Sequence, residues 1–472
     1  MFTSIEMDTE APVKPFCPPR PRPLPALAAL ARVIWSGDGN LLSLLPADAY
    51  RMDVGHLGYS RRSILIVNDP DEVRRILADT EDVFPKNDLM VQALEPLVGN
   101  SIFVSSGETW RRQRKMIDPA FTHMRITRAF SSMSAAVADY EAHLDGLAAA
   151  GEPVSLDLAM SHLTADIICR TMFSTSLASQ TARDVFDAFS LFERDAAQVG
   201  LKALIFDPPF KQVPQHAWVL DACRRIRRHL GDLIDTHLAP GSDFNDIAAD
   251  VIAARDRDTG EPFTREELID QLGVFFLAGH ETTASALTWA FFILATQGDV
   301  VSRLRAEVDA VAGDGPVTFE HTRQLAYVRN VFRETLRLYP PITFLPRVAL
   351  APVRIGRFKA KRGAMLMIAP WVLHRHEKHW REPHRFDPDR FTPEREAEIR
   401  PGTYLPFGLG PRTCVGAGFA QTEATLILAS LVRRFDFAAL APEKVRPVAR
   451  LTTRPAEQIL CRVRRRRGSA GS

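Results

Sequence analysis

The chain has 472 residues, of which 46% are hydrophobic and 25% are charged, the balance of a globular protein with a substantial core. Its formal net charge of +2 is too small to indicate a nucleic-acid partner. The five cysteines are scattered without a CxxC pair, which argues against a disulfide scaffold or zinc site and favours a reducing compartment. We therefore expect a soluble cytoplasmic protein, with peripheral membrane contact as an open alternative.

The N-terminal region is rich in proline and carries acidic residues where a secretory signal would be basic. We expect residues 1–45 to form a partly flexible leader, 46–462 a single domain, and 463–472 a basic flexible tail whose GSAGS end resembles a linker. Short strands are expected at Tyr50–Val54 and Ser63–Val67, where β-forming residues are bounded by turn residues.

Helical patterns dominate from about residue 109 to residue 312. Apolar residues recur at three- and four-residue steps in Val154–Phe173 and in Ala217–Leu238, which predicts two amphipathic helices. Thr264 and Glu267 form the S/T-x-x-E box that starts a helix, here a long central one.

The apolar stretch Leu272–Ala295 is long enough to cross a bilayer. Its middle contains His280, Glu281, Thr282 and Thr283, and a carboxylate at that depth in lipid is costly. We therefore predict no membrane span but a buried helix in a protein that is mainly α with small β-sheets.

A single cysteine lies among glycines, in Phe407-Gly-Leu-Gly410-Pro-Arg412-Thr-Cys414-Val-Gly416. The alternative for a lone cysteine is a buried structural residue. However, Gly410 permits a tight turn, Gly416 lets backbone approach a flat group, and a predicted helix from Ala417 would favour a thiolate at Cys414. Arg412 offers donors suited to a carboxylate such as a haem propionate, and Phe407 can shield the sulfur. These features are compatible with a thiolate ligand to haem iron, and the structural alternative stays open on them alone.

This motif resembles the F-x-x-G-x-R-x-C-x-G signature of the cytochrome P-450 family at all of its defined positions. The resemblance implies the cytochrome P-450 fold, with haem b (iron protoporphyrin IX) held between the long central helix and the helix after Cys414. It also implies a haem-dependent monooxygenase that inserts one oxygen atom of O2 into an apolar organic substrate, by hydroxylation or epoxidation. Two alternatives stay open: a haem-thiolate peroxygenase or isomerase, and a non-catalytic haem gas sensor.

The middle of the central helix reads Ala278-Gly279-His280-Glu281-Thr282. Small residues and threonines in a helix are commonly packing residues, but Ala278 and Thr282 are four apart and share one face. The motif resembles the oxygen-activation site of the family, which implies that Thr282 and Glu281 deliver protons and that Ala278 and Gly279 leave room beside the haem.

Glu334 and Arg337 are three residues apart on a predicted helix, where an ion pair is common on any surface. They resemble the E-x-x-R element of the family, which implies a structural triad with Arg390. Trp110 and Arg114, four apart, resemble the W-x-x-x-R helix that reaches a haem propionate.

The resemblance implies that a separate protein supplies the electrons. We expect this partner to be a ferredoxin or flavodoxin, whose reductase oxidises NAD(P)H. Arg111, Arg112 and Lys115 either dock that partner or form an ordinary solvated helix face. Arg347 is a further propionate candidate.

Apolar residues flank the motifs and can form a substrate pocket, or can equally be core packing. They are Ile102, Phe103, Phe275, Phe276, Ile342 and Phe344.

Overall fold

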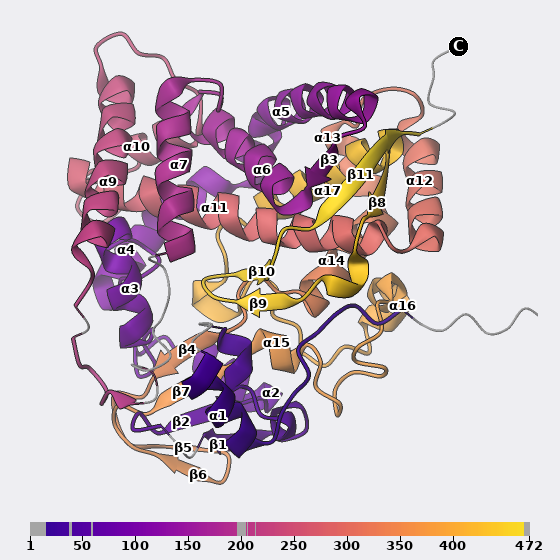
Figure 1. Cartoon of the computed structure of the whole chain (residues 1–472). Helices are drawn as coiled ribbons and strands as arrows, with labels where there is room; N and C mark the ends of the chain where they lie inside the picture. The colour runs from indigo at the N-terminus through magenta and orange to yellow at the C-terminus, as the bar shows by residue number, and fades with distance from the viewer. Residues whose placement is uncertain are drawn as a thin grey trace, which may run out of the picture.

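The computed structural model describes residues 16–36, 40–57, 60–195, 204, 206–212 and 214–466. The described chain is mainly helical, with its strands gathered into small sheets (Figure 1). The helices are α1 (Ala26–Ser36), α2 (Pro70–Leu77), α3 (Asp88–Val98), α4 (Gly107–Ile117), α5 (His123–Ala150), α6 (Leu156–Phe173), α7 (Gln180–Asp195), α9 (Ala217–Leu238), α10 (Ile247–Ala253), α11 (Arg265–Leu294), α12 (Gly298–Ala312), α13 (Phe319–Gln324), α14 (Ala326–Leu338), α15 (Pro370–Leu373), α16 (Pro393–Glu396) and α17 (Ala417–Arg434).

The strands pair into one four-stranded sheet, one three-stranded sheet and two hairpins within the described residues. They are β1 (Val54–Leu57), β2 (Ile64–Val67), β3 (Pro153–Ser155), β4 (Leu345–Val348), β5 (Val353–Ile355), β6 (Phe358–Ala360), β7 (Met365–Ile368), β8 (Phe435–Ala439), β9 (Pro447–Ala449), β10 (Thr453–Pro455) and β11 (Leu460–Arg465). The larger sheet has the order β1-β2-β7-β4, and its parallel pair β2–β7 is buried on both faces, as parallel strands usually are.

Helix α11 crosses the middle of the molecule, with α6, α9, α14 and α17 packed against it (Figure 1). The predicted capping box begins it: the hydroxyl of Thr264 accepts from the Glu267 amide, and the Glu267 carboxylate accepts from the Thr264 amide at 2.8 Å. Its side chains are apolar nearly all round, and a helix of that kind is stable only when buried on every side. No single described helix has the length and hydropathy of a membrane span. Helices α11 and α12 reach that length and hydropathy only when they are taken together, and the chain bends by 110° between them.

The strands and helices near the chain ends differ in part from the expectation. Residues 47–50 form a 3₁₀ turn, so the first strand is Val54–Leu57 and not the predicted Tyr50–Val54. Residues 463–465 were predicted to belong to the flexible tail. This prediction is wrong, because β11 continues to Arg465 and pairs with β8. Residues 467–472, with the GSAGS end, lie outside the described residues, as do residues 1–15 of the predicted leader.

Candidate active site

A largely apolar cavity of ≈ 290 Å³ lies between α11 and the loop that precedes α17. Side chains from α6 and from the segment leading into β4 complete its wall. The residues singled out in the sequence that line it are Ile102, Phe103, Trp110, Arg114, Phe275, Ala278, Gly279, Thr282, Ile342, Phe344, Arg347, Phe407, Arg412, Cys414 and Gly416.

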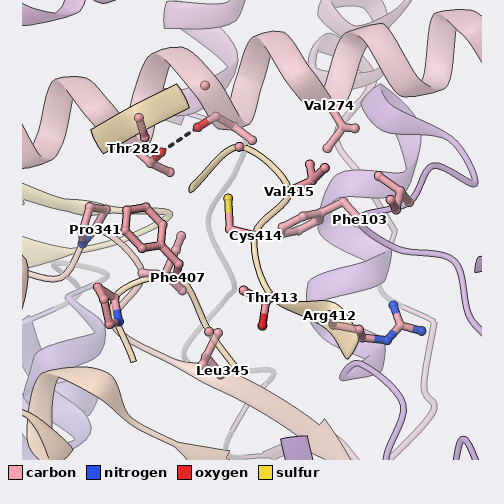
Figure 2. A pocket seen from close by; sticks show the side chains of 18 of the residues that line it. Phe103, Val274, Thr282, Pro341, Leu345, Phe407, Arg412, Thr413, Cys414 and Val415 are labelled. Carbon is pink, nitrogen blue, oxygen red and sulfur yellow. Dashed lines mark hydrogen bonds between the residues drawn. The ribbon is translucent and has the colours of Figure 1, made fainter. Parts of the chain in front are cut away.

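Helix α11 is mostly buried, but a few of its residues are exposed to the cavity. Ala278, Gly279 and Thr282 all line the cavity, and each is at least partly exposed to it. The hydroxyl of Thr282 donates to the carbonyl oxygen of Ala278 at 2.7 Å (Figure 2). Because its proton is engaged there, the hydroxyl oxygen is left to accept a hydrogen bond from a molecule in the cavity. A Cβ on Gly279 would lie 2.6 Å from Ile168, so this glycine also lets α6 approach.

The loop carrying Cys414 is fixed by its own backbone. Gly410 has φ +76°, and a Cβ there would lie 2.4 Å from the carbonyl oxygen of Leu77, so only glycine fits. The amide of Cys414 donates to the carbonyl oxygen of Phe407 at 2.9 Å. Figure 2 shows the sulfur of Cys414 pointing into the cavity toward the side on which Thr282 lies.

The thiol of Cys414 is free and exposed toward the cavity. Burial raises its pKa, and this rise is opposed by the backbone N–H of Gly416 and by the charge of Arg114. Gly416 is the N-cap of α17, so the helix dipole also favours the thiolate. A Cβ on Gly416 would meet only the Cys414 sulfur, at 4.0 Å, which leaves open space beside that sulfur.

Four cationic side chains line the cavity, and no Asp or Glu does so in the part of the chain that the structure describes. They are Lys86, Arg114, Arg347 and Arg412. Burial lowers the pKa of Arg347 to about 10, with the charge of Arg412 adding to the effect. Burial also lowers the pKa of Lys86 well below its ordinary value, helped by Arg347 and Arg412. Such a cluster favours a ligand with more than one negative group.

Arg412 is the clearest donor left for such a ligand. Its two terminal nitrogens are buried without a hydrogen bond, and Asp82 Oδ1 lies 4.0 Å from Nη2. The guanidinium stacks 4.4 Å above the ring of Trp110, which fixes its orientation. Arg114 is more fully engaged, because Nη1 donates to the Thr413 carbonyl at 2.7 Å and Nε pairs with Asp118.

Sequence reasoning missed Lys86. It reaches the cavity because Lys86 and Arg347 form an isolated antiparallel bridge beside β4. Its ammonium donates to the carbonyl oxygen of Phe103 and lies 3.8 Å from the centre of that ring. No local spacing relates Lys86 to Cys414, so only the chain topology reveals it.

Glu281 does not line the cavity, contrary to the expected pairing with Thr282. Its side chain is buried and forms an ion pair with Arg454, and it accepts a hydrogen bond from Thr452. The physical reason is helical phase: successive residues on a helix point about 100° apart, and at position 281 this direction leads away from the cavity. Glu281 therefore faces the β9–β10 hairpin.

The same helical phase separates the two predicted aromatic residues of α11. Phe275 lines the cavity and packs edge-on against Phe121 at 5.2 Å. Phe276 is fully buried away from it, with its ring 4.6 Å from Phe189. Phe276 is thus a core residue, and the expectation that it contacts substrate is wrong.

Glu334, Arg337 and Arg390 meet in the protein interior. The Arg337 guanidinium binds both oxygens of Glu334 at 2.7 Å, and both side chains are fully buried. Arg390 Nε lies 3.3 Å from the same carboxylate, and the Asp387 amide donates to it at 2.8 Å. The group ties α14 to the segment before α16 and lies outside the cavity lining.

The basic side chains of α4 are each paired with a carboxylate. Arg111 pairs with Asp82 and Glu108. Arg112 pairs with Asp256 at 3.2 Å and with Glu267 at 2.6 Å, and Lys115 lies 3.4 Å from Asp258. This face is therefore much less positive than its sequence indicates.

Comparison with known proteins agrees with this arrangement. A profile described as Cytochrome P450 matches residues 18–462. Cyclooctatin synthase of Streptomyces melanosporofaciens is 32% identical over 410 residues, spanning 86% of this chain and 87% of that protein. Cyclooctat-9-en-7-ol 5-monooxygenase of the same organism is 31% identical, spanning 85% of each. A crystal structure titled as a cytochrome P450 (CYP102L1) superposes with a TM-score of 0.79 at 24% identity, over 96% of this chain and 99% of that one. The chain belongs to the cytochrome P450 family of monooxygenases.

Proposed function

We propose that this protein is a haem b-dependent monooxygenase that oxidises an apolar organic molecule with O2. The observation that carries the proposal is the cavity itself, in which the free thiol of Cys414 points toward the side formed by Thr282 (Figure 2). The membership of the family implies the haem and an external supply of electrons.

The residues of the cavity fit a haem. Cys414 offers one thiolate, Gly416 leaves open space beside it, and the lining cations match a flat group with two carboxylates. Arg412 has unpaired buried donors for a propionate, while Arg347 and Lys86 supply further charge. Within the described residues no three His, Cys, Asp or Glu side chains converge to hold a metal ion.

The bound haem would supply oxygen activation, favoured by an electron-rich thiolate. The protein residues shape the cavity, move protons and exclude water. Ala278 and Gly279 leave room on the α11 side of the cavity because they carry no bulky side chain, and Thr282 accepts a hydrogen bond there and relays protons. The apolar lining excludes bulk water from the reacting centre.

Replacing Thr282 by alanine is expected to uncouple electron use from product formation. The variant loses the hydroxyl that accepts a hydrogen bond in the cavity, but keeps the haem ligand and the apolar lining. We expect product formed per NAD(P)H to fall about tenfold, equivalent to ~1.4 kcal/mol, while NAD(P)H consumption continues and peroxide accumulates. Thr288→Ala, which removes a matching hydroxyl bonded to Ala284 on the same helix, should leave the ratio unchanged. An unchanged ratio in the Thr282 variant would contradict this role.

Replacing Lys86 by methionine is expected to weaken haem retention roughly tenfold to a hundredfold, since a charge-assisted hydrogen bond contributes ~1.5–3 kcal/mol. Transfer of haem to apomyoglobin measures this directly. Lys115→Met removes a lysine from an exposed ion pair and is the matched control. Equal haem loss from both variants would exclude Lys86 from the haem site.

The substrate is proposed to be a mostly hydrocarbon molecule. The predicted pocket residues Ile102, Phe103, Phe275, Ile342 and Phe344 all line the cavity, and they offer no charged group. One relative is named for an alkenol substrate, cyclooctat-9-en-7-ol. We infer that an alkene or cyclic alkenol of that kind is the first class to screen.

Electrons are proposed to come from a ferredoxin or flavodoxin with an NAD(P)H-dependent reductase, in the cytoplasm. The free cysteines are consistent with a reducing compartment. Because the basic residues of α4 are already ion-paired, we expect only a modest dependence of the reduction rate on salt.

One observation favours a second candidate, a peroxide-driven oxygenase: Glu281 is turned away from the cavity. The two functions are separated by supplying ¹⁸O2, a redox partner and NAD(P)H in one reaction, and hydrogen peroxide alone in another. The monooxygenase predicts one ¹⁸O atom per product molecule in the first reaction. Product formed only with peroxide would replace the proposal by its alternative.

A further inference from the structure

The loop at residues 99–106, between α3 and α4, forms part of the cavity wall. Its side chains Ile102 and Phe103 line the cavity, as Val274 and Phe275 of α11 also do. In Figure 2, Phe103 and Val274 both lie to the right of Cys414. These four side chains carry no hydrogen-bonding group, so the shape of the wall is what they offer a ligand.

Gln271 of α11 connects the loop to the helix. The backbone N–H of Ile102 donates to Gln271 Oε1 at 3.0 Å, and the Gln271 side chain is fully buried. Residues three and four apart share one face of a helix, so Gln271 lies on the face of α11 that carries Val274 and Phe275. One side chain therefore links the two parts of the wall.

The rest of the loop is held as closely. The backbone N–H of Asn100 donates to Asp270 Oδ2 at 3.0 Å. Gly99 has φ +48°, and a Cβ there would clash with the Asp270 carboxylate, so only glycine lets the loop come this near to α11. From α4, buried Gln113 donates through Nε2 to the carbonyl oxygen of Asn100 at 2.7 Å. Its Oε1 accepts from the hydroxyl of Ser105, also at 2.7 Å.

Buried backbone groups are paired in almost every protein, so pairing alone does not indicate a function. Here the paired N–H belongs to Ile102, which lines the cavity. The next residue is fixed too, because the carbonyl oxygen of Phe103 accepts from Lys86, another residue of the lining. Polar side chains from two distant parts of the chain thus fix adjacent residues of the wall.

We propose that Gln271 is a positioning residue for the reaction: through the N–H of Ile102 it sets the distance between the loop and α11, and so selects which carbon of an apolar substrate is oxidised. This inference rests on the proposed monooxygenase function. A substrate without charged groups is oriented by the shape of the wall, and a misplacement of about 1 Å can change a rate ~100-fold. Gln271 does not line the cavity and acts through Ile102 and Phe103.

Ligand binding to the haem-loaded protein tests this role without turnover. Imidazole and 4-phenylimidazole both bind haem iron through a ring nitrogen, but only the second brings a phenyl ring into the apolar cavity. Gln271→Met keeps the length of the side chain and removes the acceptor for the Ile102 N–H. In titrations followed by the Soret band, we expect the Kd for 4-phenylimidazole to rise about tenfold and the Kd for imidazole to stay unchanged.

Two variants are matched controls. Gln271→Glu keeps an oxygen at the same place, and burial favours its neutral form, so the ratio of the two Kd values should match the wild type. Gln297→Met removes a glutamine amide beyond the end of α11, outside the cavity lining, and should change neither Kd.

Gln113→Met releases the same loop from α4 and should raise the same ratio, so it decides the question where Gln271→Met does not fold. An unchanged ratio in a folded, haem-loaded Gln271→Met protein would overturn the proposal. Equal changes in both Kd values would also overturn it, because they would mean general damage to the site.

Product analysis tests the selection of the oxidised carbon. Limonene is a cyclic alkene with several different oxidisable carbons, and we expect the ratio of its major to its minor product to fall about tenfold in Gln271→Met. A wild-type product ratio in that variant would contradict the role in selectivity. Failure of the wild type to oxidise any cyclic alkene with O2 and electrons, while the Kd ratio still responds to Gln271→Met, would refute the monooxygenase function and leave the positioning of the wall by Gln271 intact.

Discussion

Replacing Cys414 by serine is expected to abolish monooxygenation and the thiolate signature of the haem. A serine hydroxyl in this loop keeps the fold, because the Cys414 amide would still donate to Phe407 and Gly410 would still form its turn. It does not supply the electron-rich sulfur that favours oxygen activation. The reduced, carbon-monoxide-bound variant should therefore lack the red-shifted Soret band of a haem thiolate, and product formation should fall to the background rate.

Cys17→Ser is the matched control, since Cys17 is also free and exposed but is not among the residues that line the cavity. It should retain both the Soret band and the activity. A Cys414 variant that kept the thiolate band would show that another cysteine binds the iron.

Replacing Glu334 by glutamine is expected to cause a large loss of stability. The variant leaves Arg337 and Arg390 buried around a neutral amide, and breaking a buried ion pair from one side costs about 3–5 kcal/mol of unfolding free energy. The damage should be structural, since Glu334 lies outside the cavity lining. Chemical denaturation of the haem-loaded protein measures it.

Glu396→Gln provides the matched comparison, because it removes the same charge from the half-exposed Arg333–Glu396 pair. Exposed pairs contribute about 0–1 kcal/mol, so this variant should unfold at nearly the wild-type denaturant concentration. Equal losses from the two variants would mean that the buried triad does not stabilise the fold.

Much of the architecture could be predicted from local patterns. The Thr264 capping box and the three- and four-residue apolar steps of Ala217–Leu238 located helices that the structure contains, because caps and amphipathic periodicity act within one element. The strand predicted at Tyr50–Val54 was misplaced, because the 3₁₀ turn Ala47–Tyr50 takes its first residue and strand pairing begins only at Val54.

Side-chain partners were harder to predict, because they depend on contacts between distant segments. The motif alone suggested that Glu281 serves Thr282, but Arg454, far along the chain, competes for the carboxylate. Lys86 enters the cavity only through its bridge to Arg347.

The proposed oxygen-activating chemistry depends most directly on one ligand, the thiolate of Cys414. The decisive measurement is the absorption spectrum of the haem-replete wild-type protein, reduced and saturated with carbon monoxide. We predict the red-shifted Soret band that a thiolate ligand gives. A folded, haem-replete sample whose band stays at the position given by a histidine ligand would contradict the assignment of Cys414 and the oxygen-activating chemistry built on it.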